Sequence, residues 1–348
     1  MNTNEGVHVT VPPIRLALVG SGRIGTHHAR AIAREVPGAE LAAVIDPRID
    51  AATALADELG AAPAPDASAV LTDPSIDGVV VTTPAALHRD LIVDAATAGK
   101  HVFTEKPITT TLPEATECIE AARAAGVTLQ VGFNRRFAPG FAAARAAIDD
   151  GRVGTPQLLR SLTRDPGPYS GDPARTPAWT IFLETLIHDF DTLLWLNPGA
   201  SVVQVTALAD ALVRPDAKAD GFLDTSVVTL TFDNGAFATA EASFSASYGY
   251  DVRGEVFGSG GMVTAGDGRS TDMTYYGPAG LSADTSRADT DLLHSAYVGE
   301  FRAFVAAIRG ENADVPTGED GFNALAIARA AIVSVQENRS VTIEEVTR

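Results

Sequence analysis

Two separated stretches of the chain carry residues that could take a proton from a hydroxyl group and stabilise the oxygen left behind. In the first, Lys106 lies between Glu105 and Pro107 at the end of an apolar run. The proline favours an extended backbone for the lysine, and a cation at the carboxyl end of a strand would point into the cleft above a sheet. A solvated lysine in a turn is the alternative for so short a motif, and only the surrounding elements distinguish the two.

The second stretch carries a carboxylate and an imidazole four residues apart. Glu184 and His188 would share one face of a helix, with their Cβ atoms about 5–6 Å apart. A neighbouring carboxylate raises the basicity of an imidazole and fixes its orientation, which suits a general base near neutral pH. A solvated ion pair is the alternative, but a helix that is apolar over most of its circumference favours a polar site. Its apolar residues are Leu186, Ile187, Phe190, Leu193, Leu194 and Trp195.

A glycine-rich turn near the N-terminus has the pattern of a dinucleotide-binding site. Gly20, Gly22 and Gly25 follow a short apolar run and precede an alanine-rich helical pattern. The first glycine permits a tight turn, the second lets a pyrophosphate approach the backbone, and the third lets helix and strand pack closely. Asp46 ends the next apolar run, about 20 residues after the last glycine, as this fingerprint requires.

Asp46 also predicts which dinucleotide is bound. A carboxylate here accepts hydrogen bonds from the adenosine ribose and repels a 2′-phosphate, so NAD is expected rather than NADP. Arg48 is the one residue that could soften this preference. His88 could approach the nicotinamide, although a role at the start of a helix explains it equally well. The residues expected to bind the cofactor are Gly20, Gly22, Arg23, Ile24, Gly25, Asp46, Arg48, Thr82, Thr83, Pro84, His88, Glu105 and Lys106.

The elements that would position these residues alternate between strands and helices. Strands are predicted at 14–19, 41–45, 78–83, 101–104 and 127–131. Helical patterns between them indicate βαβ units and a parallel sheet. Ligands bind such sheets at the carboxyl ends of the strands, so the residues at those ends should meet in one cleft: Gly20, Asp46, Thr82 and Lys106.

The pattern changes after about residue 150. Long apolar alternations predict an antiparallel sheet, and Asp233-Asn234-Gly235 is a hairpin signal. We therefore expect an α/β fold, with an N-terminal Rossmann parallel sheet and a C-terminal α/β domain built on a large, mostly antiparallel open sheet. The strands of that sheet are predicted at 157–163, 202–208, 226–232, 236–244 and 253–257, with helices at about 139–150, 181–196, 295–309 and 320–338.

The expected domains are a flexible lead-in at 1–13, an NAD-binding Rossmann domain at 14–132, and a substrate-binding and oligomerisation domain at 133–348. The helix at 320–338 is expected to pack back on the first domain. Because a broad antiparallel sheet often leaves one face for a second subunit, a homodimer or homotetramer through the C-terminal sheet is expected.

Composition narrows the classes of partner and location. The formal net charge of −18 argues against nucleic acid or an anionic membrane surface. A single cysteine, Cys118, excludes an internal disulfide, and no metal site is expected. No apolar run has the length of a membrane span, and residues 1–13 lack the pattern of a secretory signal. A cytoplasmic protein is therefore expected.

The sequence resembles the glucose–fructose oxidoreductase / inositol 2-dehydrogenase (Gfo/Idh/MocA) family over nearly its whole length. The most specific block ends in Glu105-Lys106-Pro107, and Gly249-Tyr250-Asp251 is most similar to inositol 2-dehydrogenases. The stretches that carry the resemblance are 19–25, 98–107, 131–137, 185–191, 248–258 and 316–321.

The resemblance implies a catalytic lysine at Lys106 and a catalytic histidine at His188, in a commonly dimeric or tetrameric protein. Inositol dehydrogenases usually carry an aspartate four residues before that histidine, where this chain has Glu184. The same resemblance implies that the residues contacting a polyol or sugar are Arg136, Asp165, His188, Tyr250 and Tyr297.

The expected function is NAD-dependent oxidation of a secondary alcohol of a cyclic polyol or pyranose sugar, inositol-like, to the ketone. His188 would take the hydroxyl proton, oriented by Glu184, while Lys106 stabilises the developing alkoxide. Hydride would pass to nicotinamide C4. Two alternatives stay open: an NAD-dependent glycoside hydrolase of the same fold, and a non-catalytic NAD- or sugar-binding protein.

Overall fold

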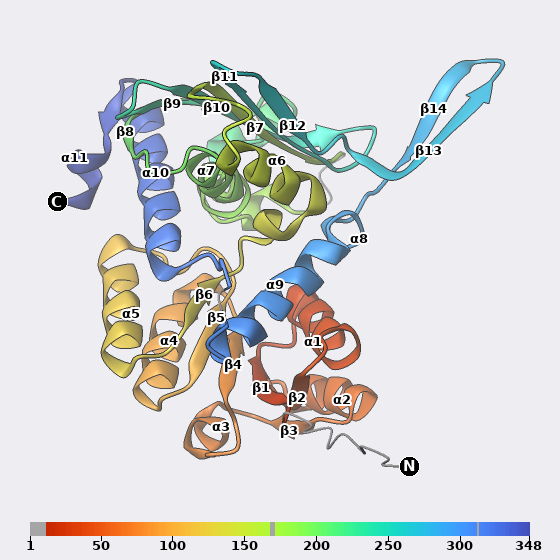
Figure 1. Ribbon diagram of the computed structural model, residues 1–348, viewed down its shortest axis with the longest axis vertical. Coiled ribbons are helices and arrows are strands. Elements are labelled where there is room, and N and C mark those ends of the chain that lie inside the picture. The colour runs from red at the N-terminus through yellow and green to blue at the C-terminus, as the bar shows by residue number, and fades with distance from the viewer. Residues whose placement is uncertain (1–11, 168–170, 312) are drawn as a thin grey trace, which may run out of the picture.

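The computed structural model describes residues 12–167, 171–311 and 313–348, so nearly all of the expected lead-in lies outside the described residues. Its first part is a parallel sheet of six strands in the order β3-β2-β1-β4-β5-β6 (Figure 1). This is the Rossmann order, in which β2 and β3 lie on one side of β1 while β4, β5 and β6 lie on the other. The topological switch point is therefore between β1 and β4. The strands are β1 (Ile14–Val19), β2 (Ala39–Ile45), β3 (Ala62–Ala64), β4 (Gly78–Val81), β5 (His101–Thr104) and β6 (Leu129–Val131).

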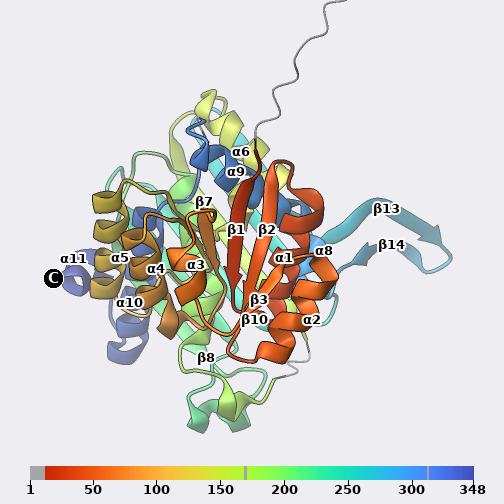
Figure 2. The same cartoon turned by 90° about the horizontal axis from the view of Figure 1, so that it is seen from below.

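Helices cover both faces of this sheet, which explains why its central strands read as continuous apolar runs. The first two helices of the chain pack on one face together with residues 298–305 from the second part, and the helices at 88–97 and 112–125 pack on the other (Figure 2). Sequence signals fix their ends: Thr111 and Glu114 form a capping box at the start of α5, and Gly126 ends it in a left-handed conformation. The helices are α1 (Arg23–Glu35), α2 (Ile49–Leu59), α3 (Ser68–Thr72), α4 (His88–Thr97) and α5 (Leu112–Ala125).

The second part is a seven-stranded sheet in the order β12-β11-β7-β10-β9-β8-β15. Neighbours are antiparallel except β7 and β10, which pair in parallel. The predicted fold class is therefore confirmed, and the predicted hairpin turn joins β9 to β10. The strands are β7 (Pro156–Pro166), β8 (Val202–Asp210), β9 (Thr225–Phe232), β10 (Phe237–Ala246), β11 (Asp251–Gly258), β12 (Met262–Ala265) and β15 (Val341–Thr342).

Helices cover one face of this sheet and leave the other exposed (Figure 1). α7 (Leu186–Trp195) packs on β7 and β10, and α10 (Gly318–Glu337) packs on β8, α7 and also α5 of the first part. α9 (His294–Ile308) returns to α1. The two parts are thus joined by helices as well as by the connecting chain. The remaining helices there are α6 (Pro139–Asp149), α8 (Asp289–Leu292) and α11 (Ile343–Thr347).

The sequence did not predict a two-stranded hairpin that extends from the body (Figures 1 and 2). It consists of β13 (Arg269–Gly277) and β14 (Gly280–Thr285). The short strands β3, β12 and β15 were also missed, because strands of a few residues leave too little periodicity to detect. No helix in the described parts of the chain has both the length and the apolarity of a membrane span.

Candidate active site

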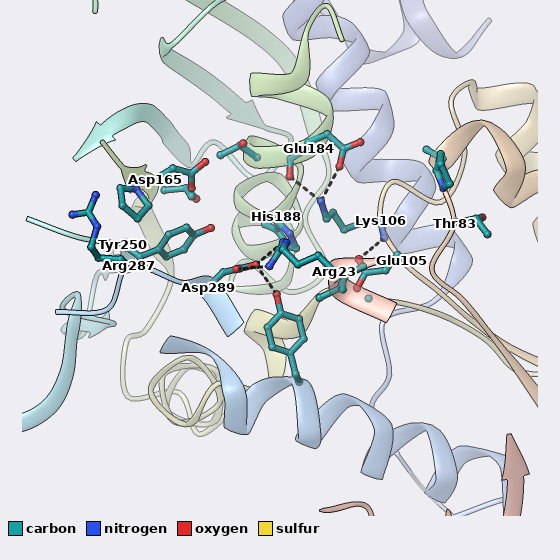
Figure 3. Close-up of a pocket in the computed structure, with 18 residues that line it drawn as sticks. Arg23, Thr83, Glu105, Lys106, Asp165, Glu184, His188, Tyr250, Arg287 and Asp289 are labelled. Carbon is teal, nitrogen blue, oxygen red and sulfur yellow. Dashed lines mark hydrogen bonds and ion pairs between the residues drawn. The ribbon is translucent and has the colours of Figure 1, made fainter. Parts of the chain in front are cut away.

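A cavity of 500 Å³ lies where the carboxyl ends of the parallel strands face the second sheet (Figure 3). It brings together residues that are far apart in the chain, as ligand sites of such sheets do. Eleven of the predicted site residues line it: Arg23, Ile24, Thr83, Pro84, Glu105, Lys106, Asp165, Glu184, His188, Tyr250 and Tyr297.

Lys106 enters the cavity from the end of β5 and forms an ion pair with Glu184. Nζ donates to Oε2 of Glu184 at 2.9 Å and to its backbone oxygen at 3.1 Å. Burial disfavours the charged amine, but the carboxylates of Glu184 and then Glu105 outweigh it and raise the pKa of Lys106. The lysine is therefore a fixed cation, joined to Pro107 by a cis peptide bond.

His188 is half-buried on α7 and opens onto the same cavity. Burial, and then the positive charges of Lys106 and Arg135, hold the pKa of His188 well below its usual range. Nδ1 of the imidazole is buried without a hydrogen-bond partner among the described residues. The ring is therefore neutral and able to accept a proton.

The expected pairing of Glu184 with His188 is wrong. Residues 181–185 form a π-helical turn, and α7 begins only at Leu186. In a turn of this kind four-residue spacing no longer places two side chains on one face. Glu184 is therefore directed to Lys106, and His188 receives no carboxylate from this helix among the described residues.

The opposite wall of the cavity carries a second polar group. Burial raises the pKa of Asp165 to about 6, although a hydrogen bond from Tyr250 opposes the shift. Asp289 accepts hydrogen bonds from Arg23 at 2.8 Å and from the hydroxyl of Tyr297 at 3.2 Å. Several acceptors and donors thus face one space, an arrangement that suits a ligand rich in hydroxyl groups.

The glycine-rich turn fits a dinucleotide pyrophosphate. Gly20 has φ of 103°, where a side chain would be strained. A Cβ atom on Gly25 would lie 1.9 Å from the backbone oxygen of Gly20, whereas one on Gly22 would meet open space. α1 begins at Arg23 without a side-chain cap, so its first N–H groups are available to a phosphate.

Asp46 lies at the end of β2 beside this turn. One carboxylate oxygen accepts from the backbone and hydroxyl of Ser21 at 2.9 and 2.8 Å. The other accepts from the backbone N–H of Arg48 at 2.9 Å. Burial opposes ionisation, but the bonds from Arg48 and Ser21 outweigh it and lower the pKa of Asp46. A charged acid at this position disfavours a 2′-phosphate.

Two of the residues expected to bind the cofactor form hydrogen bonds to backbone oxygens of neighbouring segments instead. The hydroxyl of Thr82 donates to the backbone oxygen of Gly20 at 2.7 Å, so it fixes the glycine-rich turn. The ring nitrogens of His88 lie 2.9 Å from the oxygen of Pro107 and 2.8 Å from that of Thr83. Neither residue is among the described residues that line the cavity. Both position the walls of the site.

Arg136 is likewise placed away from the expected substrate contact. Its guanidinium is buried between Asp191, at 2.5 Å, and Asp320, at 2.8 Å. It therefore connects the segment after β6 to α7 and α10. The double arginine follows a strand end, where a sequence pattern does not distinguish a ligand contact from a buried ion pair.

Asp289 and Arg287 line the cavity but were not predicted. They precede or begin the short helix α8, after the missed hairpin, in the sequence Ser-Arg-Ala-Asp-Thr-Asp. Neither periodicity nor a motif singles them out. Only the chain path after β14 brings them to the cavity.

Comparisons with known proteins assign both parts of the chain to one family. Residues 14–133 match the oxidoreductase family with an NAD-binding Rossmann fold, GFO_IDH_MocA. Residues 141–264 match the GFO/IDH/MocA C-terminal domain. The two matches together span more than half of the chain.

Named relatives align over almost the whole length. The myo-inositol 2-dehydrogenase of Thermotoga maritima is 36% identical over 335 residues, which cover 96% of this chain and 99% of that protein. The scyllo-inositol 2-dehydrogenase (NAD(+)) of Bacillus subtilis is 35% identical over 332 residues, covering 95% and 96%. The solved structure of scyllo-inositol dehydrogenase from Lactobacillus casei, with bound NAD(H) and scyllo-inositol, has a TM-score of 0.90 at 27% identity, covering 95% and 99% of the two chains.

Proposed function

This chain belongs to the GFO/IDH/MocA oxidoreductase family, and from that premise we propose that it oxidises one secondary alcohol of an inositol or a related cyclic polyol or pyranose to the ketone. Its first part is the NAD-binding Rossmann domain of that family. The observation that carries the proposal is the cavity that holds a cationic Lys106 and a neutral His188 beside the glycine-rich turn.

NAD is the cofactor, and Gly20, Gly22, Asp46 and the start of α1 would hold it. When bound it supplies the acceptor for the hydride that leaves the alcohol carbon. The buried hydroxyl of Thr83, which has no partner among the described residues, offers a further polar group at the cavity wall. In this proposal these residues bind and orient the cofactor, and other side chains of the cavity handle the proton of the substrate hydroxyl.

His188 acts as the base in this proposal. A neutral imidazole that opens onto the cavity can take the hydroxyl proton as the alcohol is oxidised. Lys106 donates a hydrogen bond to the same oxygen, and its positive charge stabilises the alkoxide that develops there. Glu184 keeps that charge in place through its 2.9 Å contact with Nζ. Because Glu184 pairs with Lys106, it does not orient the base.

The substrate is proposed to be a ring with several hydroxyl groups. Asp165, Tyr250, Asp289 and Tyr297 offer donors and acceptors in the cavity. A buried polar group is costly when unpaired, so such a wall favours a ligand whose hydroxyls pair with it. The named relatives act on myo- and scyllo-inositol, which belong to this chemical class.

A panel of inositol isomers and aldoses with NAD and NADP tests the proposal directly. Absorbance of reduced cofactor should accumulate with NAD and at least one cyclic polyol. Lys106→Ala should abolish this turnover while NAD still binds, as measured by fluorescence titration. Sugar release from a glycoside without net NADH would favour the hydrolase alternative. Substantial turnover by Lys106→Ala would refute the assigned role of the lysine.

We also propose that the open face of the second sheet packs against another copy of the chain. Four large apolar residues lie side by side across neighbouring strands, in register and more than two-fifths exposed. Exposed rows of this kind mark interfaces, and most oligomers are symmetric assemblies of one chain. The row runs from β12 to β10 through Met262, Phe257, Leu158 and Phe237.

A further inference from the structure

A buried cluster beneath the end of β5 has no part in the steps proposed above. His28 lies on α1, Glu105 follows β5, and Glu300 lies on α9, so three elements meet there. One imidazole or carboxylate atom from each lies within 4.8 Å of the others, and all three residues are buried. The aromatic rings that pack around His28, with centroids 4.9 to 5.8 Å from its own, are Phe103, Tyr297 and Phe301.

Within this cluster the carboxylate of Glu105 is held at both oxygens. Oε1 lies 2.7 Å from Nε2 of His28, and Oε2 accepts the backbone N–H of Lys106 at 3.1 Å. Burial disfavours the charged form, but His28 and then Lys106 outweigh it and lower the pKa of Glu105. Glu105 is therefore a charged group that connects His28 to the backbone of the catalytic lysine.

Glu300 is in the opposite protonation state. Neither of its carboxyl oxygens has a hydrogen-bond partner among the described residues, and Oε1 lies 3.9 Å from Nε2 of His28. Burial, followed by the charge of Glu105, raises the pKa of Glu300 well above its usual range. Glu300 is thus an uncharged acid behind His28, where a second carboxylate would repel Glu105.

We propose, resting on the function above, that His28 is a positioning residue that fixes Glu105 and thereby the backbone of Lys106, with Glu300 filling the space behind it. His28 lies on the helix that begins at the glycine-rich turn, so it joins the cofactor-binding element to the catalytic strand end. The cluster thus fixes the lysine relative to the dinucleotide, as catalytic geometry requires. The other titratable groups that face it are His27, Lys106, Tyr297 and, through the Tyr297 hydroxyl, Asp289.

His28→Phe and His28→Gln form a matched pair to test this. Phenylalanine keeps the aromatic packing but removes Nε2, so the pKa of Glu105 should rise and Lys106 should lose its support. We expect kcat to fall at least about tenfold, the effect of losing a hydrogen bond to a charged group. The acid limb of the kcat pH profile should move to higher pH. Glutamine supplies an N–H donor and should restore much of the rate and the parental profile.

A double-mutant cycle separates positioning from general damage to the fold. Once Glu105→Gln has removed the charge that His28 supports, adding His28→Phe should cost little more. Independent losses would instead multiply. Multiplying losses, or a His28→Phe enzyme with the parental kcat and pH profile, would overturn the role of His28.

The protonation state of Glu300 can be measured without turnover. An infrared spectrum of the parent at neutral pH should contain the carbonyl band of a buried protonated carboxyl group, absent in Glu300→Gln. That variant should keep the parental melting temperature and kcat, because an uncharged amide matches an uncharged acid. Absence of the band in the parent would refute the proposed arrangement of the cluster, in which Glu300 is protonated, whether or not a polyol is oxidised. Presence of the band without polyol oxidation would refute only the proposed reaction.

Discussion

Glu184 stabilises the charged form of Lys106, the lysine that we propose assists the reaction. Its carboxylate lies 2.9 Å from Nζ of Lys106 and is the strongest influence that opposes burial in raising the pKa of that amine. We predict that Glu184→Gln lowers kcat about tenfold, the effect of losing a charge-assisted hydrogen bond. The alkaline limb of the kcat pH profile should move to lower pH, because Lys106 then loses its proton more readily. Initial rates of NADH formation across the alkaline range measure both effects.

Glu184→Asp is the matched control for this change. Aspartate keeps the negative charge but withdraws it by one methylene, so the rate should lie between those of the parent and Glu184→Gln. Its alkaline limb should stay close to that of the parent. If the limb of Glu184→Gln stays at the parental pH, the ion pair does not govern the protonation of Lys106.

Asp165 should determine how kcat/KM changes with pH in the acidic range. Burial raises the pKa of Asp165 to about 6, so this carboxyl is neutral below that pH and charged above it. Because the charged form accepts hydrogen bonds from hydroxyl groups more strongly, kcat/KM should rise as the pH increases through about 6. Asp165→Asn should remove that step and lower the plateau about tenfold. A step that survives in Asp165→Asn must belong to another group.

At the scale of elements, the turn between β1 and α1 needs glycine for two different reasons: close packing at Gly25 and the approach of the cofactor at Gly22. A Cβ atom on Gly25 would lie 1.9 Å from the backbone oxygen of Gly20, so Gly25→Ala must displace the turn. We predict that this variant has a lower melting temperature and loses NAD binding. Calorimetry and a fluorescence titration with NAD measure the two losses separately.

Gly22→Ala provides the comparison within the same turn. A Cβ atom there meets nothing within 4 Å, so the melting temperature of this variant should equal that of the parent. NAD should still bind more weakly, because the methyl group occupies the approach of the pyrophosphate. Equal NAD affinity in Gly22→Ala and the parent would mean that the cofactor does not approach this turn.

The elements that sequence reasoning predicted best are those with long periodic patterns and clear end signals. β1, α1, β2 and the β9–β10 hairpin follow from apolar runs bounded by glycine or by Asp-Asn-Gly. The segment at 181–196 was predicted as one helix, but its first five residues form a π-helical turn. Such a turn depends on tertiary packing rather than on residue preference, so the direction of Glu184 could not be deduced.

The site residues also divide into those that a local sequence pattern predicts and those whose place depends on tertiary packing. Lys106 could be predicted to lie in the cleft because it follows the end of a parallel strand, whereas His188 lies on a helix of the second part and was singled out by its polar pattern and the family resemblance. Arg136 was misplaced because its two carboxylate partners, Asp191 and Asp320, come from helices whose packing no local pattern specifies. Asp289 was missed because the path of the chain after the β13–β14 hairpin determines its place.

On the scale of the whole molecule, the cavity belongs to neither sheet alone. α9 and α10 return from the second part to pack on the first, and Arg23 of α1 pairs with Asp289 of α8 at 2.8 Å. This arrangement keeps the cofactor-binding turn and the polyol-facing wall at a fixed separation. The second sheet therefore has one face committed to the site and its covering helices, and one face free.

The free face makes a prediction about assembly. Phe237 and Leu158 are paired in register and each is 56% exposed, so a lysine at either position would place a charge in the proposed interface. We predict that the parent chain is a dimer or tetramer by light scattering and that Phe237→Lys has a smaller mass. Ile49→Lys, at an exposed apolar position on α2, should leave the mass unchanged. A parent that is monomeric at every concentration, or a Phe237→Lys variant with the parental mass, would show that this face is not the interface.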